Sequence, residues 1–320
     1  MTRLRTAVIG SGYLGRFHAQ KYAALPDSEL VAVVDTDQDR ARAVARELGC
    51  EALHDYRQLP GRVDAVSIVV PTRLHHQVAA TMLRNGVHVL VEKPVTVSVE
   101  EADELIGLAS SGGLRLQVGH LERFNPAVQG LVGLVTTPMF IESHRLAPYN
   151  PRGADVSVVL DLMIHDIDII LNLVRQPLSR IDANGVPVIS SDIDIANARL
   201  QFANGCVANV TASRVSLKSE RKMRLFQRSA YIALDFQERT LDVRRTTDTL
   251  EAGGIPEIRS DQQTFPGGDA IMSEIAAFLA SIRDGSRPIV SGEDGRQALA
   301  TAIEITRQLN EHPLPGQSGT

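Results

Sequence analysis

The sequence predicts an α/β protein, with a doubly wound parallel sheet first and an α+β domain with a large, mostly antiparallel open sheet second. Apolar strands and helices alternate strictly over about the first 120 residues, which is typical of a parallel sheet covered on both faces. Beyond about residue 121, short strands of alternating polarity replace this pattern. Because 320 residues exceed one ordinary domain, we expect domains at residues 1–121 and 122–320.

The elements of the N-terminal half follow from short runs of Val, Ile and Leu that stop at turn residues. Gly49 is a typical glycine stop for the helix expected over 38–49. Ser98 with Glu101 forms the N-terminal capping pattern of the helix expected over 98–110. We expect strands over 6–10, 29–35, 64–71, 88–93 and 114–120, and helices over 13–25, 38–49, 75–86 and 98–110.

The first strand-to-helix turn carries a phosphate-binding pattern, GxGxxG, formed by Gly10, Gly12 and Gly15. The first glycine suits a tight turn, the second lets the backbone approach a pyrophosphate, and the third lets the helix pack closely. Tyr13 and Leu14 open the helix, whose N-terminus faces the anion. This context indicates a Rossmann domain.

The acid at the end of the second strand indicates which dinucleotide is bound. Asp35 can accept hydrogen bonds from the adenosine ribose, whereas a 2′-phosphate would meet both Asp35 and Asp37, so we expect NAD rather than NADP. Ligands of such sheets bind outside the carboxyl ends of the strands. The further cofactor candidates at those ends are Pro71, Thr72, His75, Glu92 and Lys93.

The pattern of the C-terminal half predicts strands joined by short turns, followed by two helices at the end of the chain. Asn204-Gly205 between two alternating strands predicts a hairpin with a type I′ turn. Asp269 is the expected N-cap of the first closing helix and Gly285 its stop. We expect strands over 139–147, 222–227, 230–236 and 240–245, a hairpin over 195–215, and helices over 158–174, 269–283 and 292–309.

The helix expected over 158–174 is apolar nearly all round, which predicts burial. Yet Asp161, His165, Asp168 and Asn172 recur at helical spacing and form one polar stripe. Because buried polar groups must be satisfied, aligned polar groups on such a helix favour a functional site over a core histidine. Nothing there matches a zinc motif, and we expect no metal.

The composition excludes several classes of function. The chain has 33 basic and 38 acidic side chains, a net charge of −5, so a dedicated nucleic-acid or anionic-membrane surface is not expected. We find neither a signal peptide pattern nor an apolar stretch long enough for a bilayer. The two cysteines form no disulfide framework and suggest a reducing compartment. We expect a cytoplasmic protein.

Three motifs together carry a family resemblance: the GxGxxG turn, Glu-Lys-Pro at 92–94, and Asp-x-x-x-His at 161–165. In this order they resemble the Gfo/Idh/MocA oxidoreductases, the glucose–fructose oxidoreductase and inositol dehydrogenase family, over nearly the whole chain. The resemblance implies NAD(P)-dependent oxidation of a sugar or cyclitol hydroxyl and a homodimer or homotetramer. It assigns catalysis to Lys93, Asp161 and His165. Met163 stands where many members have glycine, which alters the expected pocket shape.

A narrower resemblance involves segments 119–128, 144–168 and 212–227, which are similar to a bacterial subgroup acting on UDP-N-acetylglucosamine. It implies oxidation of the sugar 3-hydroxyl and coupling to an aminotransferase, for amino sugars of the lipid A type. A diphosphate needs cationic partners, although a basic strand edge can simply be solvated. The substrate candidates are Arg123, Asn125, Arg145, Arg152, Asp161, His165, Arg214 and Lys218.

Oxidation of a secondary alcohol requires a base that removes the hydroxyl proton as the hydride leaves. We favour His165 as the proton acceptor, with Lys93 hydrogen-bonded to the same oxygen. The reverse assignment, in which Lys93 accepts the proton, stays open. Glu92 is expected to anchor its loop or the nicotinamide ribose. Two alternatives also stay open: a dehydrogenase of a free sugar or inositol, and a non-catalytic dinucleotide-binding sensor.

Overall fold

The computed structural model describes residues 2–150, 156–250 and 256–311. Its chain forms two compact units, which are described separately below. The first contains residues 1–124 and 269–299, and the second contains 125–268 and 300–320. No helix in the described part of the chain has both the length and the apolarity needed to cross a membrane.

The domain boundaries differ from the expected division at residue 121, because residues 269–299 belong to the first unit. Helix α7 (Ala270–Asp284) in this segment contributes Ile275 and Phe278 to the core that surrounds Val8 and Tyr22. Asp269 caps this helix by accepting from the main-chain N–H of Met272, and Gly285 ends it in the left-handed conformation, as predicted. A later segment of the chain thus completes the earlier domain.

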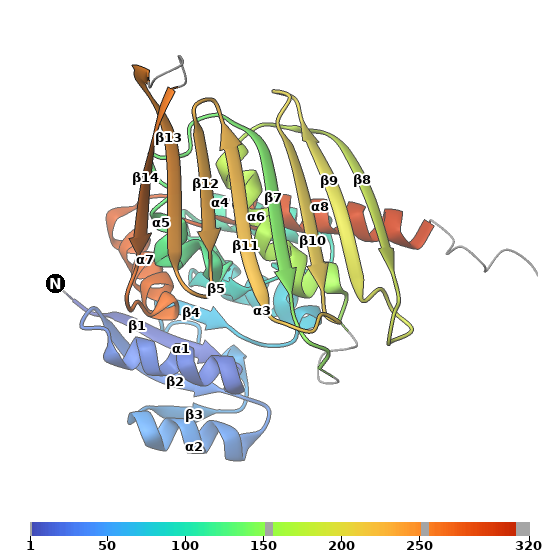
Figure 1. The fold of residues 1–320 in the computed structure, drawn as a ribbon. Coiled ribbons are helices and arrows are strands. Elements are labelled where there is room, and N and C mark those ends of the chain that lie inside the picture. Colours follow the sequence, from blue (N-terminus) through green and yellow to red (C-terminus); the bar gives the residue numbers. More distant parts are fainter. Residues whose placement is uncertain (1, 151–155, 251–255, 312–320) are drawn as a thin grey trace, which may run out of the picture. The chain divides into compact units, whose positions relative to one another are not determined.

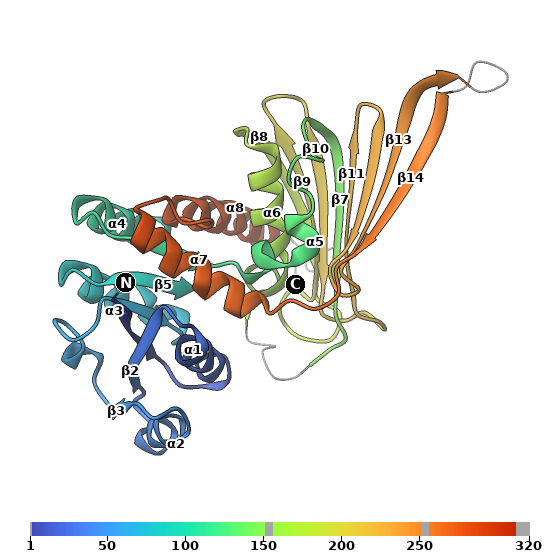
Figure 2. The ribbon, with the colours of Figure 1, turned by 90° about the vertical axis from the view of Figure 1, so that its left-hand side faces the viewer.

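The first unit is built on a six-stranded parallel sheet in the order β3-β2-β1-β4-β5-β6, which is the Rossmann topology predicted from the sequence. Its strands are β1 (Leu4–Ile9), β2 (Ser28–Val34), β3 (Glu51–Leu53), β4 (Ala65–Ile68), β5 (His88–Glu92) and β6 (Leu116–Gly119). Its helices include α1 (Tyr13–Ala24), α2 (Gln38–Leu48), α3 (His75–Arg84) and α4 (Val99–Ser111) (Figure 2). The edge strand β3 was not predicted, because three residues are too few for a periodic pattern.

The second unit is built on the eight-stranded sheet β14-β13-β12-β11-β7-β10-β9-β8 (Figure 1). Strands β7 and β10 pair in parallel and the other neighbours are antiparallel, which confirms the predicted sheet type. Its strands are β7 (Pro138–Leu146), β8 (Leu178–Val186), β9 (Ile195–Phe202), β10 (Val207–Ser213), β11 (Glu220–Gln227), β12 (Ala230–Asp235), β13 (Thr240–Leu250) and β14 (Pro256–Thr264). Its helices include α5 (Pro126–Gln129) and α6 (Ile164–Val174), and α8 (Gly292–Glu311) runs from one unit into the other.

The two edge strands of this sheet, β8 and β14, were not predicted. Their residues are mostly half-buried or exposed, so they lack the alternation of apolar and polar residues that marks a strand with one buried face. Figure 2 shows β13 and β14 extending past the other strands of the sheet.

The turn between β9 and β10 differs in type from the prediction. A type I′ turn needs a positive φ at both Asn204 and Gly205, and only Gly205 has one, at 85°. The main-chain N–H of Phe202 donates to the carbonyl of Cys206, and the Asn204 side chain accepts from the N–H of Cys206. The hairpin is confirmed, but its loop is one residue longer than the predicted one.

Candidate active site

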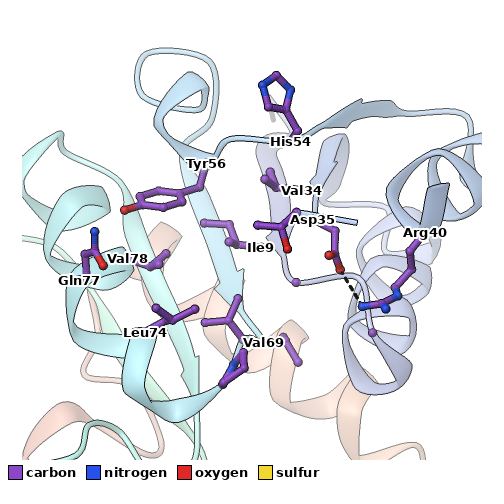
Figure 3. A pocket seen from close by; sticks show the side chains of 15 residues that line it. Ile9, Val34, Asp35, Arg40, His54, Tyr56, Val69, Leu74, Gln77 and Val78 are labelled. Carbon is purple, nitrogen blue, oxygen red and sulfur yellow. Dashed lines mark hydrogen bonds and ion pairs between the residues drawn. The ribbon is translucent and has the colours of Figure 1, made fainter. Parts of the chain in front are cut away.

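A cavity of about 400 Å³ opens at the carboxyl ends of β1, β2 and β4 (Figure 3). Neighbouring β1 and β4 are where the strand order of the sheet reverses, and dinucleotides bind at such a crevice. Four of the residues predicted to bind the cofactor line this cavity: Gly10, Gly12, Asp35 and Pro71.

The three glycines of the first turn have different surroundings. A Cβ on Gly10 would collide with the carbonyl oxygen of Val69, and one on Gly15 with the carbonyl oxygen of Gly10. A Cβ on Gly12 would meet no atom within 4 Å. Gly12 is also the N-cap of α1 and provides no side-chain cap, so the helix presents uncapped N–H groups there. The open space at Gly12 fits a pyrophosphate at this helix N-terminus.

Asp35 is held in place by the turn that it faces. One carboxylate oxygen accepts from the main-chain N–H of Ser11 at 2.9 Å and from its hydroxyl at 3.0 Å, and the other accepts from the N–H of Asp37 at 2.9 Å. Burial alone would raise the pKa of Asp35, but these hydrogen bonds and the nearby Arg40 guanidinium lower it overall. A fixed, ionised carboxylate suits a ribose diol.

Sequence reasoning missed several residues of this cavity, among them Arg40, His54, Tyr56 and Leu74. Figure 3 shows Arg40 beside Asp35, and Tyr56 and Leu74 across the cavity from them. His54 directly follows the unpredicted strand β3, so the rule that ligands bind at strand ends would have found it had that strand been recognised.

Substituting Gly12 with alanine should weaken cofactor binding without unfolding the protein. The added methyl group has room in this structure but would occupy the space that we assign to the pyrophosphate. Losing one charged hydrogen bond there should raise the KM for NAD by about tenfold to a hundredfold. Gly107→Ala, in the open middle of α4, is the matched control and should leave the KM unchanged. An unchanged KM in Gly12→Ala would contradict this assignment.

The other predicted cofactor residues do not line this cavity. Tyr13 is 86% exposed beside Phe17, and Leu14 follows it in the first turn of α1. Thr72 begins a short 3₁₀ helix, and His75 is buried with its ring nitrogens 2.9 Å from the carbonyl oxygen of Pro94 and 2.8 Å from that of Val70. His75 thus braces two strand ends against each other, and burial lowers its pKa.

The Glu-Lys-Pro segment begins with the last residue of β5, at the carboxyl edge of the same sheet. Lys93 is half-buried, and its bond to Pro94 is cis. The Glu92 side chain is only 13% exposed and lies 3.3 Å from the imidazole of His18. The contact with His18 is consistent with the expected role of Glu92 in anchoring its loop, and its other expected role, at the nicotinamide ribose, stays a prediction.

The polar helix of the second unit is less regular than predicted. Residues Val159–Met163 are π-helical, and α6 begins at Ile164. The polar stripe runs from exposed Asp161 through half-buried His165 to Asp168, which is 2% exposed. Single π-turns occur often at functional sites. Met163 is fully buried and belongs to the core of this unit.

Arg145, a predicted phosphate partner, pairs with a buried acid of its own unit. Its guanidinium makes a bidentate ion pair with the Asp166 carboxylate, at 2.7 and 3.2 Å, and both side chains are almost fully buried. The guanidinium also lies over the ring of Phe236, 5.3 Å from its centre. Asp166 lies off the polar stripe, and the structure gives it a structural partner.

Arg214, another predicted substrate residue, likewise pairs with a buried acid. It donates to the buried carboxylate of Asp194 at 2.9 Å and to the main-chain carbonyl of Val156 at 2.7 Å. Lys218 is exposed, and Arg152 lies outside the described residues. The Arg123 guanidinium donates to the carbonyl of Ile289.

Asn125 has a capping role in the second unit. Its side-chain oxygen accepts from the N–H of Ala127 at the start of α5, and its amide donates to the carbonyl of Phe236. The substrate roles of Arg123, Asn125, Arg145, Arg214 and Lys218 stay predictions.

The Rossmann topology, the open space at Gly12 and the oriented carboxylate of Asp35 define an NAD-binding protein of the dehydrogenase class. Comparison with known families agrees. Residues 4–120 match an oxidoreductase family with an NAD-binding Rossmann fold, and residues 138–232 match the GFO/IDH/MocA C-terminal domain. The chain belongs to the Gfo/Idh/MocA oxidoreductase family, as its three motifs predicted.

Individual relatives extend over nearly the whole chain. The chain is 42% identical to UDP-N-acetylglucosamine 3-dehydrogenase of Acidithiobacillus ferrooxidans, over 95% of this chain and 97% of that protein. It is 30% identical to scyllo-inositol 2-dehydrogenase (NAD(+)) of Bacillus subtilis, over 96% of this chain and 94% of that protein.

Solved structures show the same fold. That of UDP-N-acetylglucosamine 3-dehydrogenase GnnA from A. ferrooxidans matches with a TM-score of 0.90 at 40% identity, covering 97% of this chain and 98% of that one. Scyllo-inositol dehydrogenase from Lactobacillus casei with bound NAD(H) and scyllo-inositol matches with a TM-score of 0.80, covering 97% and 98%. At 20% identity, the second match shows the fold alone.

Proposed function

We propose that this protein oxidises the 3-hydroxyl of UDP-N-acetylglucosamine to the 3-keto sugar with NAD. The observation that carries the proposal is the 42% identity to a UDP-N-acetylglucosamine 3-dehydrogenase over 95% of the chain. This identity is well above the 30% found with the inositol enzyme of B. subtilis, which acts on a free cyclitol.

The first unit supplies the cofactor site. When bound, NAD provides the hydride acceptor. The N-terminus of α1 at Gly12 would hold the pyrophosphate, and Asp35 would accept from the adenosine ribose hydroxyls. Lys93, at the carboxyl end of β5, would donate a hydrogen bond to the reacting hydroxyl oxygen and stabilise the alkoxide character that develops there.

The second unit supplies the base. His165, half-buried on α6, would accept the hydroxyl proton as the hydride leaves the sugar carbon. Asp161, exposed in the preceding π-turn, would orient the imidazole or hold the sugar. Exposed Lys218 remains a candidate partner for the diphosphate.

The product suggests the protein's place in metabolism. A 3-keto sugar is a substrate for transamination, so an aminotransferase would consume the product and lead to amino sugars of the lipid A type. Removing the ketone would also draw an unfavourable oxidation forward. We further propose a cytoplasmic homodimer or homotetramer, in keeping with the family resemblance.

A substrate panel tests the proposal. Purified protein is incubated with NAD and, separately, UDP-N-acetylglucosamine, UDP-glucose, N-acetylglucosamine 1-phosphate and scyllo-inositol, with NADH absorbance as the readout. An aminotransferase and an amino donor are added to remove the ketone. We expect UDP-N-acetylglucosamine to be the preferred substrate. Faster turnover of inositol would favour the free-cyclitol alternative. NAD binding without turnover of any compound would favour the non-catalytic sensor.

A further inference from the structure

The first unit contains a buried group of ionisable side chains that the proposed reaction does not use. His18 on α1 and Glu274 on α7 are fully buried, and Glu92 at the end of β5 is 13% exposed. One side-chain nitrogen or oxygen from each of the three lies within 4.8 Å of the other two. Residues far apart in the sequence thus place two carboxyl groups and an imidazole together.

Glu274 lies in an environment that disfavours its charge. Both of its carboxyl oxygens are buried and have no hydrogen-bond partner among the described residues. The Gln117 side chain of β6 donates to its main-chain carbonyl at 3.1 Å, which fixes this part of α7 against the sheet. Burial, and then the charge of Glu92, raise the pKa of Glu274 well above its ordinary value of 4.5.

Two other ionisable groups near the cluster, Tyr22 and His120, supply no positive charge that would stabilise an ionised Glu274. Tyr22 of α1 hydrogen-bonds to Ser67, and burial raises the pKa of the phenol. His120 follows β6, and its burial together with the charges of Arg123 and Lys93 lowers its pKa to about 3. The phenol and this imidazole are therefore both uncharged near neutral pH.

Glu92, in contrast, has groups that suit a carboxylate. One of its oxygens lies 3.3 Å from Nε2 of His18, and the other accepts from the main-chain N–H of Lys93 at 3.3 Å. Nδ1 of His18 contacts the Ser67 hydroxyl at 3.1 Å, which orients the ring. A Cβ on Gly119 would lie 2.7 Å from a Glu92 oxygen, so β6 limits the movement of this carboxylate.

We propose that Glu92 and Glu274 share one proton, that this proton resides on Glu274, and that the resulting neutral acid positions Glu92 and the backbone of Lys93. Two carboxylates this close in an apolar core do not both ionise. Glu92 keeps the charge because it is partly exposed and has two nitrogens beside it. Glu274 is thus a positioning residue. The positioning role rests on the proposed function, whereas the shared proton does not.

The protonation is tested by unfolding the wild type and Glu274→Gln in denaturant across a pH series. Because the native pKa is raised, the wild type's stability from this group is fully present below about pH 4.5 and is lost as the pH rises through the native pKa. The glutamine variant lacks this loss. Between about pH 4.5 and the native pKa, its unfolding constant should fall relative to that of the wild type by up to about tenfold per pH unit, and above the native pKa the two curves should run parallel. Stability curves that run parallel over the whole pH series would overturn the shared proton.

A divalent cation could neutralise the same three side chains, so the proton must be distinguished from a metal. Wild-type protein is dialysed against a chelator, analysed for zinc and manganese, and melted with and without each ion. We expect no stoichiometric metal and no change in Tm. Stoichiometric metal whose removal lowers the Tm would overturn the proton assignment. Neither this experiment nor the pH series requires a substrate, so both remain informative if the proposed function fails.

The positioning role is tested by comparing two substitutions of Glu274. Glutamine keeps an uncharged polar side chain beside Glu92, whereas methionine keeps the length and removes the polar group. Glu274→Gln should retain kcat, and Glu274→Met should lose about tenfold to a hundredfold in kcat with the KM for NAD unchanged. Equal kcat in the two folded variants would overturn the positioning role. If the methionine variant fails to fold, a large loss of kcat in folded Glu274→Gln would overturn the positioning role instead.

Discussion

Lys93→Met should lower kcat by about a hundredfold to ten-thousandfold, the range that a positioned proton-transfer or alkoxide-stabilising group contributes. Methionine keeps the length of the side chain and removes the ammonium group. Because the cavity at Gly12 and Asp35 does not include Lys93, the affinity for NAD should survive. Steady-state kinetics and NAD titration by fluorescence or calorimetry measure the two quantities separately.

Lys21→Met is the matched control for this variant. Lys21 lies on α1 in the same unit and pairs with Asp269 at 2.6 Å, away from the strand ends. The substitution is chemically identical, so kcat should stay within about twofold, because partly exposed ion pairs contribute little. Wild-type turnover in Lys93→Met would remove Lys93 from the reaction, and a loss of NAD affinity would assign it to the cofactor instead.

His165→Asn should lower kcat by a similar factor, because asparagine is polar but cannot accept the proton. His144→Asn, on β7 of the same unit, is its control and should retain activity, since His144 lies near Glu220 and is 41% exposed. The KM for NAD should stay unchanged in both variants. Near-wild-type turnover in His165→Asn would exclude His165 as the base.

The pH dependence of kcat/KM distinguishes the two candidate proton acceptors. If His165 takes the proton, kcat/KM of Lys93→Met should still fall at low pH, because the base becomes protonated there. The same fall should be missing from the profile of His165→Asn. The reverse pattern would assign the base to Lys93. This comparison addresses the alternative that the sequence left open.

Much of the cofactor site could be predicted because its signals are local. Gly10, Gly12 and Gly15 follow one another in a single turn, and Asp35 ends the very next strand. The cap Asp269 and the stop Gly285 could be read from the chain in the same way. In each of these cases the physical cause of the structure lies within a few residues of its effect.

The contacts that could not be predicted concern side chains whose partners are distant in the sequence. The ion pairs of Arg145 and Arg214 could not be predicted, because the sequence around a basic residue does not show which distant buried carboxylate pairs with it. The burial of Glu274 was not predicted, because an acid in an amphipathic helix is ordinarily solvated. Only the fold shows that it lies beside Glu92. Strand β3 was too short to show a period, so His54 at its end was missed as well.

The most direct test of the proposed reaction follows the hydride itself. UDP-N-acetylglucosamine carrying deuterium at C3 is incubated with NAD and the protein, and the reduced cofactor is analysed by mass spectrometry and NMR. We expect the deuterium to appear at C4 of the reduced nicotinamide and the labelled substrate to react more slowly. Unlabelled NADH, or deuterium retained at C3 in the product, would contradict oxidation at this carbon.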